Sequence, residues 1–251
     1  MARNKPTKSK SSVQTPSSSG KQTVAARPNW PLFKPLLPVA PLSLEPPVPA
    51  LEDKILVARN FFPRSLCRDY VTFLQSLPLV TTPGRPKRGE AVRVNDRFQI
   101  DDFQFAQRLW LETGLKDLLN QESVRHLWEG EVAGLNPNIR VYRYSKGQFF
   151  DAHYDDFNDV VLPTAETTGS ISTRTTWTLL LYLTSAADGC LGGETCFYPH
   201  DRKVKNEEVV IAPETGMLLL HKHGDDCLLH EGREVLDGHK WILRSDICVR
   251  R

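Results

Sequence analysis

A His-x-Asp pair and one distant histidine constrain the fold of this 251-residue chain more than any other feature. His153 and Asp155 lie two residues apart, so on an extended strand both side chains point to the same side. His230 lies 75 residues beyond Asp155, so it can join them only if the fold brings two distant segments together. Two imidazoles and a carboxylate on one octahedral face suit non-haem Fe(II) with positions left open, and zinc is the alternative ion.

Two cations follow His230 at strand spacing. Within residues 240–244, alternation puts Lys240, Ile242 and Arg244 on one face of a strand. A ligand that chelates iron through a keto acid end needs a counter-charge for its far carboxylate, because an unpaired charge in an apolar barrel is costly. The two cations are therefore candidates to face a dicarboxylate ligand.

Three other histidines, His221, His223 and His239, are rivals for the third ligand position. We prefer His230 because the leucines before it and the glycine after it indicate a strand end that leads into a turn. His223 precedes a Gly-Asp-Asp sequence and is expected in an exposed turn. His239 directly precedes Lys240, so it should point to the opposite face of the strand.

Helices are expected first along the chain and strands afterwards. Apolar spacing predicts a helix that starts at an N-cap, Ser65, and runs through Leu77, and two further helices over residues 102–111 and 115–119. Short apolar segments between Gly, Pro and Asp turns predict strands over residues 55–57, 139–144, 177–183, 194–198, 209–212, 217–221, 226–230 and 240–248. This succession argues for an α+β chain with a double-stranded β-helix (jelly-roll) core and N-terminal supporting helices.

The first 50 residues are rich in Lys, Ser, Thr and Pro and lack acidic residues before Glu45, which is typical of a disordered tail. Its basic residues permit nuclear import, and its Ser-rich character permits a mitochondrial transit peptide, although prolines oppose a targeting helix. We expect a helical support region over residues 51–135 and the jelly-roll core over 136–251. Residues 83–89 are expected as an exposed loop, and residues 157–173 as either a lid or a plain surface loop.

Composition agrees with one modest domain. A formal charge of +2 and 40% hydrophobic residues give no reason to expect an anionic membrane as partner. Nucleic acid is not expected either, because basic and aromatic residues form no obvious base-stacking platform. Five cysteines without regular spacing, and no signal-peptide pattern, favour an intracellular protein of the cytoplasm or nucleus.

Four blocks in a fixed order resemble the prolyl 4-hydroxylase branch of the Fe(II)/2-oxoglutarate-dependent dioxygenases. The resemblance runs over roughly residues 140–250, and its blocks are residues 144–155, residues 178–183, residues 192–195, and His230-Glu231-Gly232 with Val235, Gly238 and Lys240. It implies that iron is bound by His153, Asp155 and His230. It also implies that Lys240 holds the far carboxylate of 2-oxoglutarate, a role that Arg244 could share or replace as a bidentate donor.

The same resemblance suggests how the cosubstrate is held and what the reaction is. The hydroxyls of Thr178 and Tyr144 are expected to help seat 2-oxoglutarate, with Tyr182 as a weaker candidate. Oxidative decarboxylation of 2-oxoglutarate would consume dioxygen and be coupled to hydroxylation of a C–H bond, with ascorbate as an accessory reductant. The substrate is expected to be a peptidyl prolyl residue, or a small molecule such as an amino acid. The alternative from another class is a non-catalytic jelly-roll metal-binding module.

Overall fold

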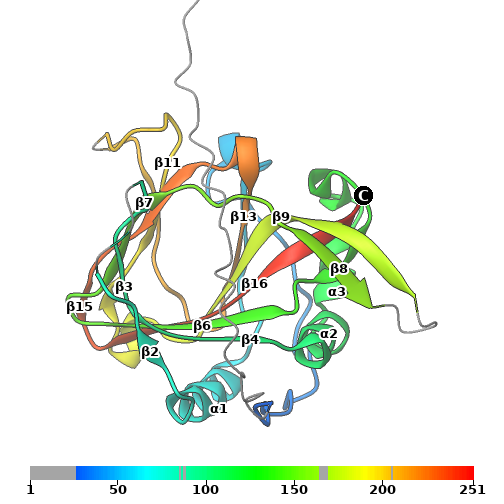
Figure 1. Ribbon diagram of the computed structural model, residues 1–251, viewed down its shortest axis with the longest axis horizontal. Coiled ribbons are helices and arrows are strands. Elements are labelled where there is room, and N and C mark those ends of the chain that lie inside the picture. Colours follow the sequence, from blue (N-terminus) through cyan, green and yellow to red (C-terminus); the bar gives the residue numbers. More distant parts are fainter. Residues whose placement is uncertain (1–26, 85, 87–88, 164–168, 205) are drawn as a thin grey trace, which may run out of the picture.

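Two antiparallel sheets face each other in the computed structural model, which describes residues 27–84, 86, 89–163, 169–204 and 206–251. The major sheet runs in the order β1-β13-β9-β16-β6-β4-β2, with β5 beside β16 and β8 beside β9 (Figure 1). Its strands are β1 (Ile55–Ala58), β2 (Val80–Thr81), β4 (Asp96–Asp101), β5 (Val132–Leu135), β6 (Asn138–Ser145), β8 (Asp159–Pro163), β9 (Ser170–Tyr182), β13 (Leu218–Lys222) and β16 (His239–Arg250).

The minor sheet has the order β12-β11-β14-β7-β3. Its strands are β3 (Arg93–Val94), β7 (Phe149–His153), β11 (Thr195–Tyr198), β12 (Val209–Ile211) and β14 (Leu229–Gly232), and a separate pair joins β10 (Leu191–Gly192) to β15 (Val235–Asp237). Two facing antiparallel sheets of this kind form the predicted double-stranded β-helix. The prediction of fold class is therefore confirmed.

Alternation along the major sheet produces two cores. Leu179, Leu181 and Leu243 point outward and pack with the helices, whereas Tyr182 and Ile242 point inward between the sheets. Because successive side chains of a strand face opposite sides, one sheet can cover the helices and line the barrel at once. The polar and charged residues of the site lie on the inward face.

Three helices cover the outer face of the major sheet, away from the minor sheet (Figure 1). They are α1 (Arg64–Gln75), α2 (Phe103–Glu112) and α3 (Leu115–Leu119). The second begins where Asp102 accepts a hydrogen bond from the Phe105 amide, as an N-cap should, and the third has its predicted bounds. Ser65 is not an N-cap, because α1 begins one residue earlier, after Pro63. Within the described part of the chain, no helix is long and apolar enough to cross a membrane.

The prediction of a disordered tail does not hold for residues 27–50. Trp30 is 6% exposed, its ring stacks on Phe105 at 3.9 Å between centroids, and its Nε1 donates a 2.9 Å hydrogen bond to Asp102. Leu37 is buried in the same core. A few apolar anchors therefore hold a proline-rich segment on the helices, and residues 1–26 lie outside the described part.

Other boundaries also differ from expectation. Residues 157–173, predicted as a loop, contain β8 and the start of β9, paired as a hairpin, while residues 164–168 lie outside the described part. The expected strand at 226–230 starts only at Leu229, after a 3-10 turn. The helical support region also contributes strands, since β1 and β4 pair within the major sheet and β3 pairs with β7. It is part of the barrel rather than a separate layer. The described residues within 83–89 are exposed, as predicted.

Replacing Trp30 by alanine should destabilise the domain by about 3–5 kcal/mol, because it removes a buried indole and its hydrogen bond. Leu36 is the matched control in the same segment, since it is 87% exposed. Leu36→Ala should change the free energy of unfolding by less than about 0.5 kcal/mol. Urea denaturation followed by circular dichroism measures both, and equal effects would show that the segment does not pack on the domain in solution.

Candidate metal and cosubstrate site

Strand register brings the two predicted histidine ligands face to face. In the minor sheet His153 of β7 pairs directly with His230 of β14, and their ring centroids are 4.2 Å apart. Asp155 Oδ1 lies 3.8 Å from His153 Nε2. One ligand atom from each of these three residues lies within 4.8 Å of the others, which is close enough for a single ion.

The geometry of the His-x-Asp pair differs in detail from a continuous strand. The strand β7 ends at His153, so Asp155 belongs to the segment that follows it. Its amide contacts the Cys227 thiol, at 3.3 Å, and its carbonyl accepts a hydrogen bond from the Gly224 amide. These contacts, rather than strand alternation, turn the carboxylate towards the two imidazoles.

Both ligand histidines present Nε2 to the centre. The Nδ1 of His153 lies 2.8 Å from the Asp151 carbonyl, and that of His230 lies 2.9 Å from the Leu228 carbonyl. A carbonyl can only accept, so each Nδ1 carries the proton and each Nε2 is left with a lone pair for a metal. Burial lowers the pKa of His153 to about 3 and also lowers that of His230. Both rings are therefore neutral at physiological pH, as ligation requires.

Asp155 is held ionised by its neighbours. Its Oδ2 accepts a 2.8 Å hydrogen bond from Arg244 and a 2.6 Å hydrogen bond from Thr178. Burial alone would raise the pKa of Asp155, but the Arg244 guanidinium and the nearby histidines hold it well below its usual value. With Oδ2 occupied in this way, Oδ1 is the oxygen that faces His153 and can bind a metal.

Arg244 also interacts with a second buried carboxylate, that of Asp246. Asp246 lies 3.5 Å from Arg244 Nε and also pairs with Arg140. The carboxylate of Asp246 is fully buried, and the two arginines keep its pKa low despite burial. Positive and negative side chains thus alternate along the inner face of the barrel.

Lys240 is a buried cation without a counter-ion. Its side chain is inside the barrel, 3% exposed, with Nζ 5.7 Å and 5.4 Å from the ring centroids of Tyr144 and Tyr182. Within the described ranges it forms neither a hydrogen bond nor an ion pair. Burial lowers the pKa of Lys240 to about 8. A buried ammonium of this kind is a ready binding site for a carboxylate.

A narrow cavity joins Lys240 to the metal ligands. Most of the predicted site residues line it, and the full lining is Tyr142, Tyr144, Phe150, His153, Leu180, Thr195, His221, His230, Glu231, Gly232, Lys240, Ile242 and Arg244. Its volume is about 40 Å³, so binding of a five-carbon diacid requires movement of the lining side chains. One end of the cavity has imidazoles that can bind a metal, and the other end has an ammonium group that can bind a carboxylate.

Several predicted residues lie where the sequence did not place them. Thr178 does not line the cavity but contacts Asp155 and His223, so it supports the carboxylate ligand. His223 is 7% exposed, so the prediction of an exposed turn is wrong; the ring lies under Asp155, between Thr178 and Asp246. His239 is exposed and Lys240 is buried, as alternation predicts.

Sequence reasoning missed two cavity residues. Thr195 lines the cavity and its Oγ1 lies 2.7 Å from the Tyr182 hydroxyl, although the sequence suggested only that it belongs to a strand. His221 lines the metal end, although it was considered only as a rival to His230. Its position two residues before His223, on a strand facing the barrel, was the only available signal.

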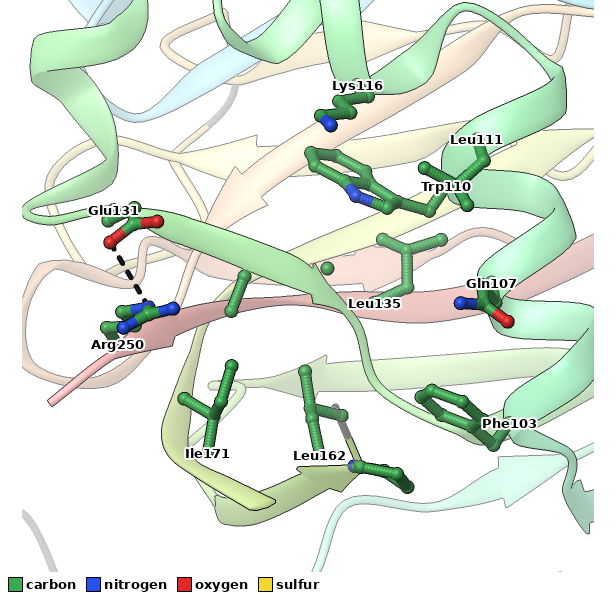
Figure 2. A pocket seen from close by; sticks show the side chains of 13 residues that line it. Phe103, Gln107, Trp110, Leu111, Lys116, Glu131, Leu135, Leu162, Ile171 and Arg250 are labelled. Carbon is green, nitrogen blue, oxygen red and sulfur yellow. Dashed lines mark ion pairs between the residues drawn. The ribbon is translucent and has the colours of Figure 1, made fainter. Parts of the chain in front are cut away.

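A larger cleft lies at the opposite end of β16 (Figure 2). It has a volume of about 580 Å³ and shares no lining residue with the narrow cavity. Figure 2 shows the Glu131–Arg250 ion pair, 3.1 Å, at its edge and Trp110 beside Lys116. Of the residue types that bind metals through carboxylate, imidazole or thiolate, its lining contains only Glu131. The cleft is therefore not the metal site.

Comparison with known proteins relates the second half of the chain to one superfamily. Residues 139–245 match the 2OG-Fe(II) oxygenase superfamily, and this segment contains all three candidate metal ligands and Lys240. The jelly-roll part of the chain is thus similar to a superfamily that uses Fe(II) and 2-oxoglutarate. An enzyme of this type is favoured over the non-catalytic module. A search of curated proteins gave no match.

Solved structures share the fold at low sequence identity. A prolyl-4-hydroxylase from Pseudomonas putida aligns with a TM-score of 0.54 and 16% identity, over 80% of this chain and 98% of its own. A prolyl hydroxylase from Trichoplax adhaerens, in complex with a hypoxia inducible factor peptide fragment, gives 0.51 and 19%, over 78% and 83%. HygX from Streptomyces hygroscopicus, with nickel and 2-oxoglutarate bound, gives 0.51 and 16%, over 80% and 85%. The barrel and its covering helices are thus a known architecture.

Removing the Thr178 hydroxyl should weaken metal binding, because it removes one of the two donors that orient Asp155. Thr178→Val should lower the affinity for Co(II) or Fe(II) about tenfold, at the lower end of the range for residues that position metal ligands. Thr176→Val is the matched control on the same strand, since its buried hydroxyl has no hydrogen-bond partner in the described structure. Metal titration followed by competition with a chromophoric chelator would refute this role if both variants bound alike.

Proposed function

We propose that the protein is an Fe(II)- and 2-oxoglutarate-dependent dioxygenase that hydroxylates a C–H bond of a peptidyl prolyl residue or of a small molecule such as an amino acid. One observation carries this proposal. The candidate triad combines two neutral imidazoles with one ionised carboxylate, and its two histidines line the same cavity as a buried ammonium that has no counter-ion among the described residues. This pairing fits a ligand that chelates a metal at one end and carries a carboxylate at the other.

The residues of the chain fit the absent groups. Iron would be held by His153, Asp155 and His230, whose donor atoms already converge. When bound together, Fe(II) and 2-oxoglutarate would supply the chemistry of hydroxylation, with dioxygen as the oxidant and succinate and carbon dioxide as coproducts. Lys240 would hold the far carboxylate, because it is the one buried cation of the cavity that no carboxylate neutralises in the described structure.

Protein groups also set the geometry of the centre. Arg244 and Thr178 fix the orientation of Asp155, and the carbonyls that accept from the two ligand histidines fix their tautomers. Phe150 stacks on the His153 ring with centroids 3.6 Å apart, which limits ring rotation and excludes water from that side. The chain thus supplies a preorganised site whose chemistry comes from the bound groups.

The neighbourhood of the ligand pair supports an organic substrate with apolar surface. Tyr154 and Phe157, on the segment that carries Asp155, are 41% and 43% exposed. Exposed aromatic side chains beside a site commonly contact a ligand. Among the structural neighbours, one prolyl hydroxylase is complexed with a peptide and HygX with hygromycin B. These relatives support a peptide or a small molecule as the substrate class.

Anaerobic addition of Fe(II) and 2-oxoglutarate should produce the weak visible charge-transfer band of the chelate. Asp155→Ala should abolish this band and also 2-oxoglutarate-dependent succinate formation, because the variant lacks an anionic ligand and leaves Arg244 without its partner. Glu129→Ala, a change at an exposed carboxylate of the surface, is the control. Full succinate production by Asp155→Ala would refute the ligand assignment, and zinc retention without a band in the unmodified protein would favour the binding module.

The affinity for 2-oxoglutarate should fall as pH rises above about 8. Burial lowers the pKa of Lys240 to about 8, so the free site carries its charge below that pH and loses it above. The dissociation constant should be flat from pH 6.5 to 7.5 and then rise by up to about tenfold per pH unit. Lys240→Arg is the control, because a guanidinium stays charged throughout. The same rise in both proteins would show that another group is responsible.

A further inference from the structure

A third imidazole points into the metal end of the cavity. His221 lies on β13 of the major sheet, opposite the minor-sheet strands that carry the other two histidines. Its ring centroid is 4.4 Å from that of His230, and its Nε2 is 3.7 Å from Asp155 Oδ2. His221 also belongs to a second group, with Cys227 and His230, whose ligand atoms lie within 4.8 Å of one another. It shares His230 with the triad but is not grouped with His153 and Asp155, so its ring has to shift to reach an ion that the triad holds.

His221 has no hydrogen-bond partner among the described residues. The ring is 2% exposed, its Nδ1 is buried and unsatisfied, and its Nε2 has only the 3.7 Å contact with Asp155 Oδ2. An unsatisfied buried polar group of this kind destabilises a fold. The histidines that the superfamily uses as ligands show the opposite pattern, because a carbonyl satisfies each Nδ1.

An apolar residue would suit the protein environment of His221 better. The edge of the ring packs on Phe197, at 5.4 Å between centroids, and Leu219 lies two residues before it on the same inward face. A bound ion or ligand that interacts with the ring nitrogen would stabilise an imidazole at such a position. A metal ion at this centre would give Nε2 a partner, whereas the nearby Asp155 Oδ2 already accepts hydrogen bonds from Arg244 and Thr178.

We propose that His221 is a fourth protein ligand of the metal, bound when 2-oxoglutarate is absent and released when the diacid binds. This inference rests on the metal site of the proposed function. His221 lines the cavity of about 40 Å³ that the diacid must enter, so binding of the diacid requires this ring to move. Its release also leaves the sixth position of an octahedral ion open, because the triad takes three positions and a keto acid chelate takes two. Because His221 belongs to the opposite sheet, it can leave without disturbing β7 or β14.

The resting site would therefore resemble a closed zinc site. Three imidazoles and a carboxylate satisfy the four-coordinate preference of Zn(II), whereas the triad alone leaves an open position. The resting protein should bind zinc more tightly than a protein with the triad alone. The diacid would compete with His221 and should weaken this advantage.

The number of imidazoles on the metal tests the proposal directly. The full-length protein is loaded with slightly less than one equivalent of Cu(II), and pulsed EPR counts the coordinated imidazoles. We expect three in the unmodified protein, two in His221→Gln, and three in His239→Gln, a matched change at an exposed histidine of β16. Addition of 2-oxoglutarate to the unmodified protein should lower the count from three to two.

Zinc affinity provides a second measurement on the same proteins. His221→Gln should bind Zn(II) at least about tenfold more weakly than the unmodified protein, and His239→Gln should stay within about twofold. If His221→Gln fails to fold by near-ultraviolet circular dichroism, His221→Phe replaces it, because the site already packs against an aromatic ring.

The outcomes separate this inference from the proposed function. Two imidazoles in the unmodified protein, with an unchanged count in His221→Gln, would overturn the fourth-ligand role and leave the triad intact. A count that does not fall in His153→Ala, or no stoichiometric metal binding at all, would overturn the proposed function as well. Three imidazoles that persist at saturating 2-oxoglutarate would overturn the release of His221.

Discussion

The register of β7 against β14 is the constraint on which the site depends. It sets His153 directly opposite His230, although 77 residues separate them in the sequence. A slip by one residue would turn one of the two imidazoles to the outer face of the minor sheet, because side chains alternate along a strand. The Phe150–Gly232 pair, on the other side of an irregularity in the ladder, helps to fix this register. Backbone pairing thus brings the two histidines of the candidate metal site together before any metal is bound.

Burial of the carboxylate ligand depends on a second interaction, the pair between Asp155 and Arg244. A buried carboxylate alone would take up a proton or destabilise the fold, and it would then be a poor ligand. Arg244 prevents this, and Asp246 with Arg140 in turn balances Arg244. Removing one member of such a chain leaves an uncompensated charge, which costs more than the pair contributes. The charges of Asp155, Arg244, Asp246 and Arg140 therefore depend on one another for their stability inside the barrel.

Much of this architecture could be predicted from sequence. Long segments with periodic apolar residues predict helices and strands, and the spacing of the ligand motif predicts the site. The last two helices were predicted at or near their observed bounds, as were the strands that carry Tyr144 and Lys240. Strands of two residues, such as β3 and β10, are too short to show an alternating pattern in the sequence. They are defined only by their pairing with β7 and β15. Trp30 was hidden by the composition around it, because a few buried contacts suffice to hold a segment that looks disordered on average.

The side-chain roles were harder, because they depend on which inward residues meet across the barrel. Thr178 and His221 lie on neighbouring strands in direct register, and both approach the Asp155 carboxylate. No spacing rule along the chain reports such a meeting. A hydroxyl expected to bind cosubstrate therefore contacts the candidate carboxylate ligand, and a histidine that was not preferred lines the metal end of the cavity.

The choice between Lys240 and Arg244 for the far carboxylate illustrates the same point, and here the charges decide. Both cations line the cavity from one strand face, as alternation predicts. Arg244 would have to give up Asp155 and Asp246 to bind a diacid, so any gain would be offset by two broken ion pairs. Lys240 has no such partner in the described structure, and an incoming carboxylate would relieve the cost of its burial. The diacid is therefore expected to lie with its far end at Lys240 and its keto acid end towards the three ligands.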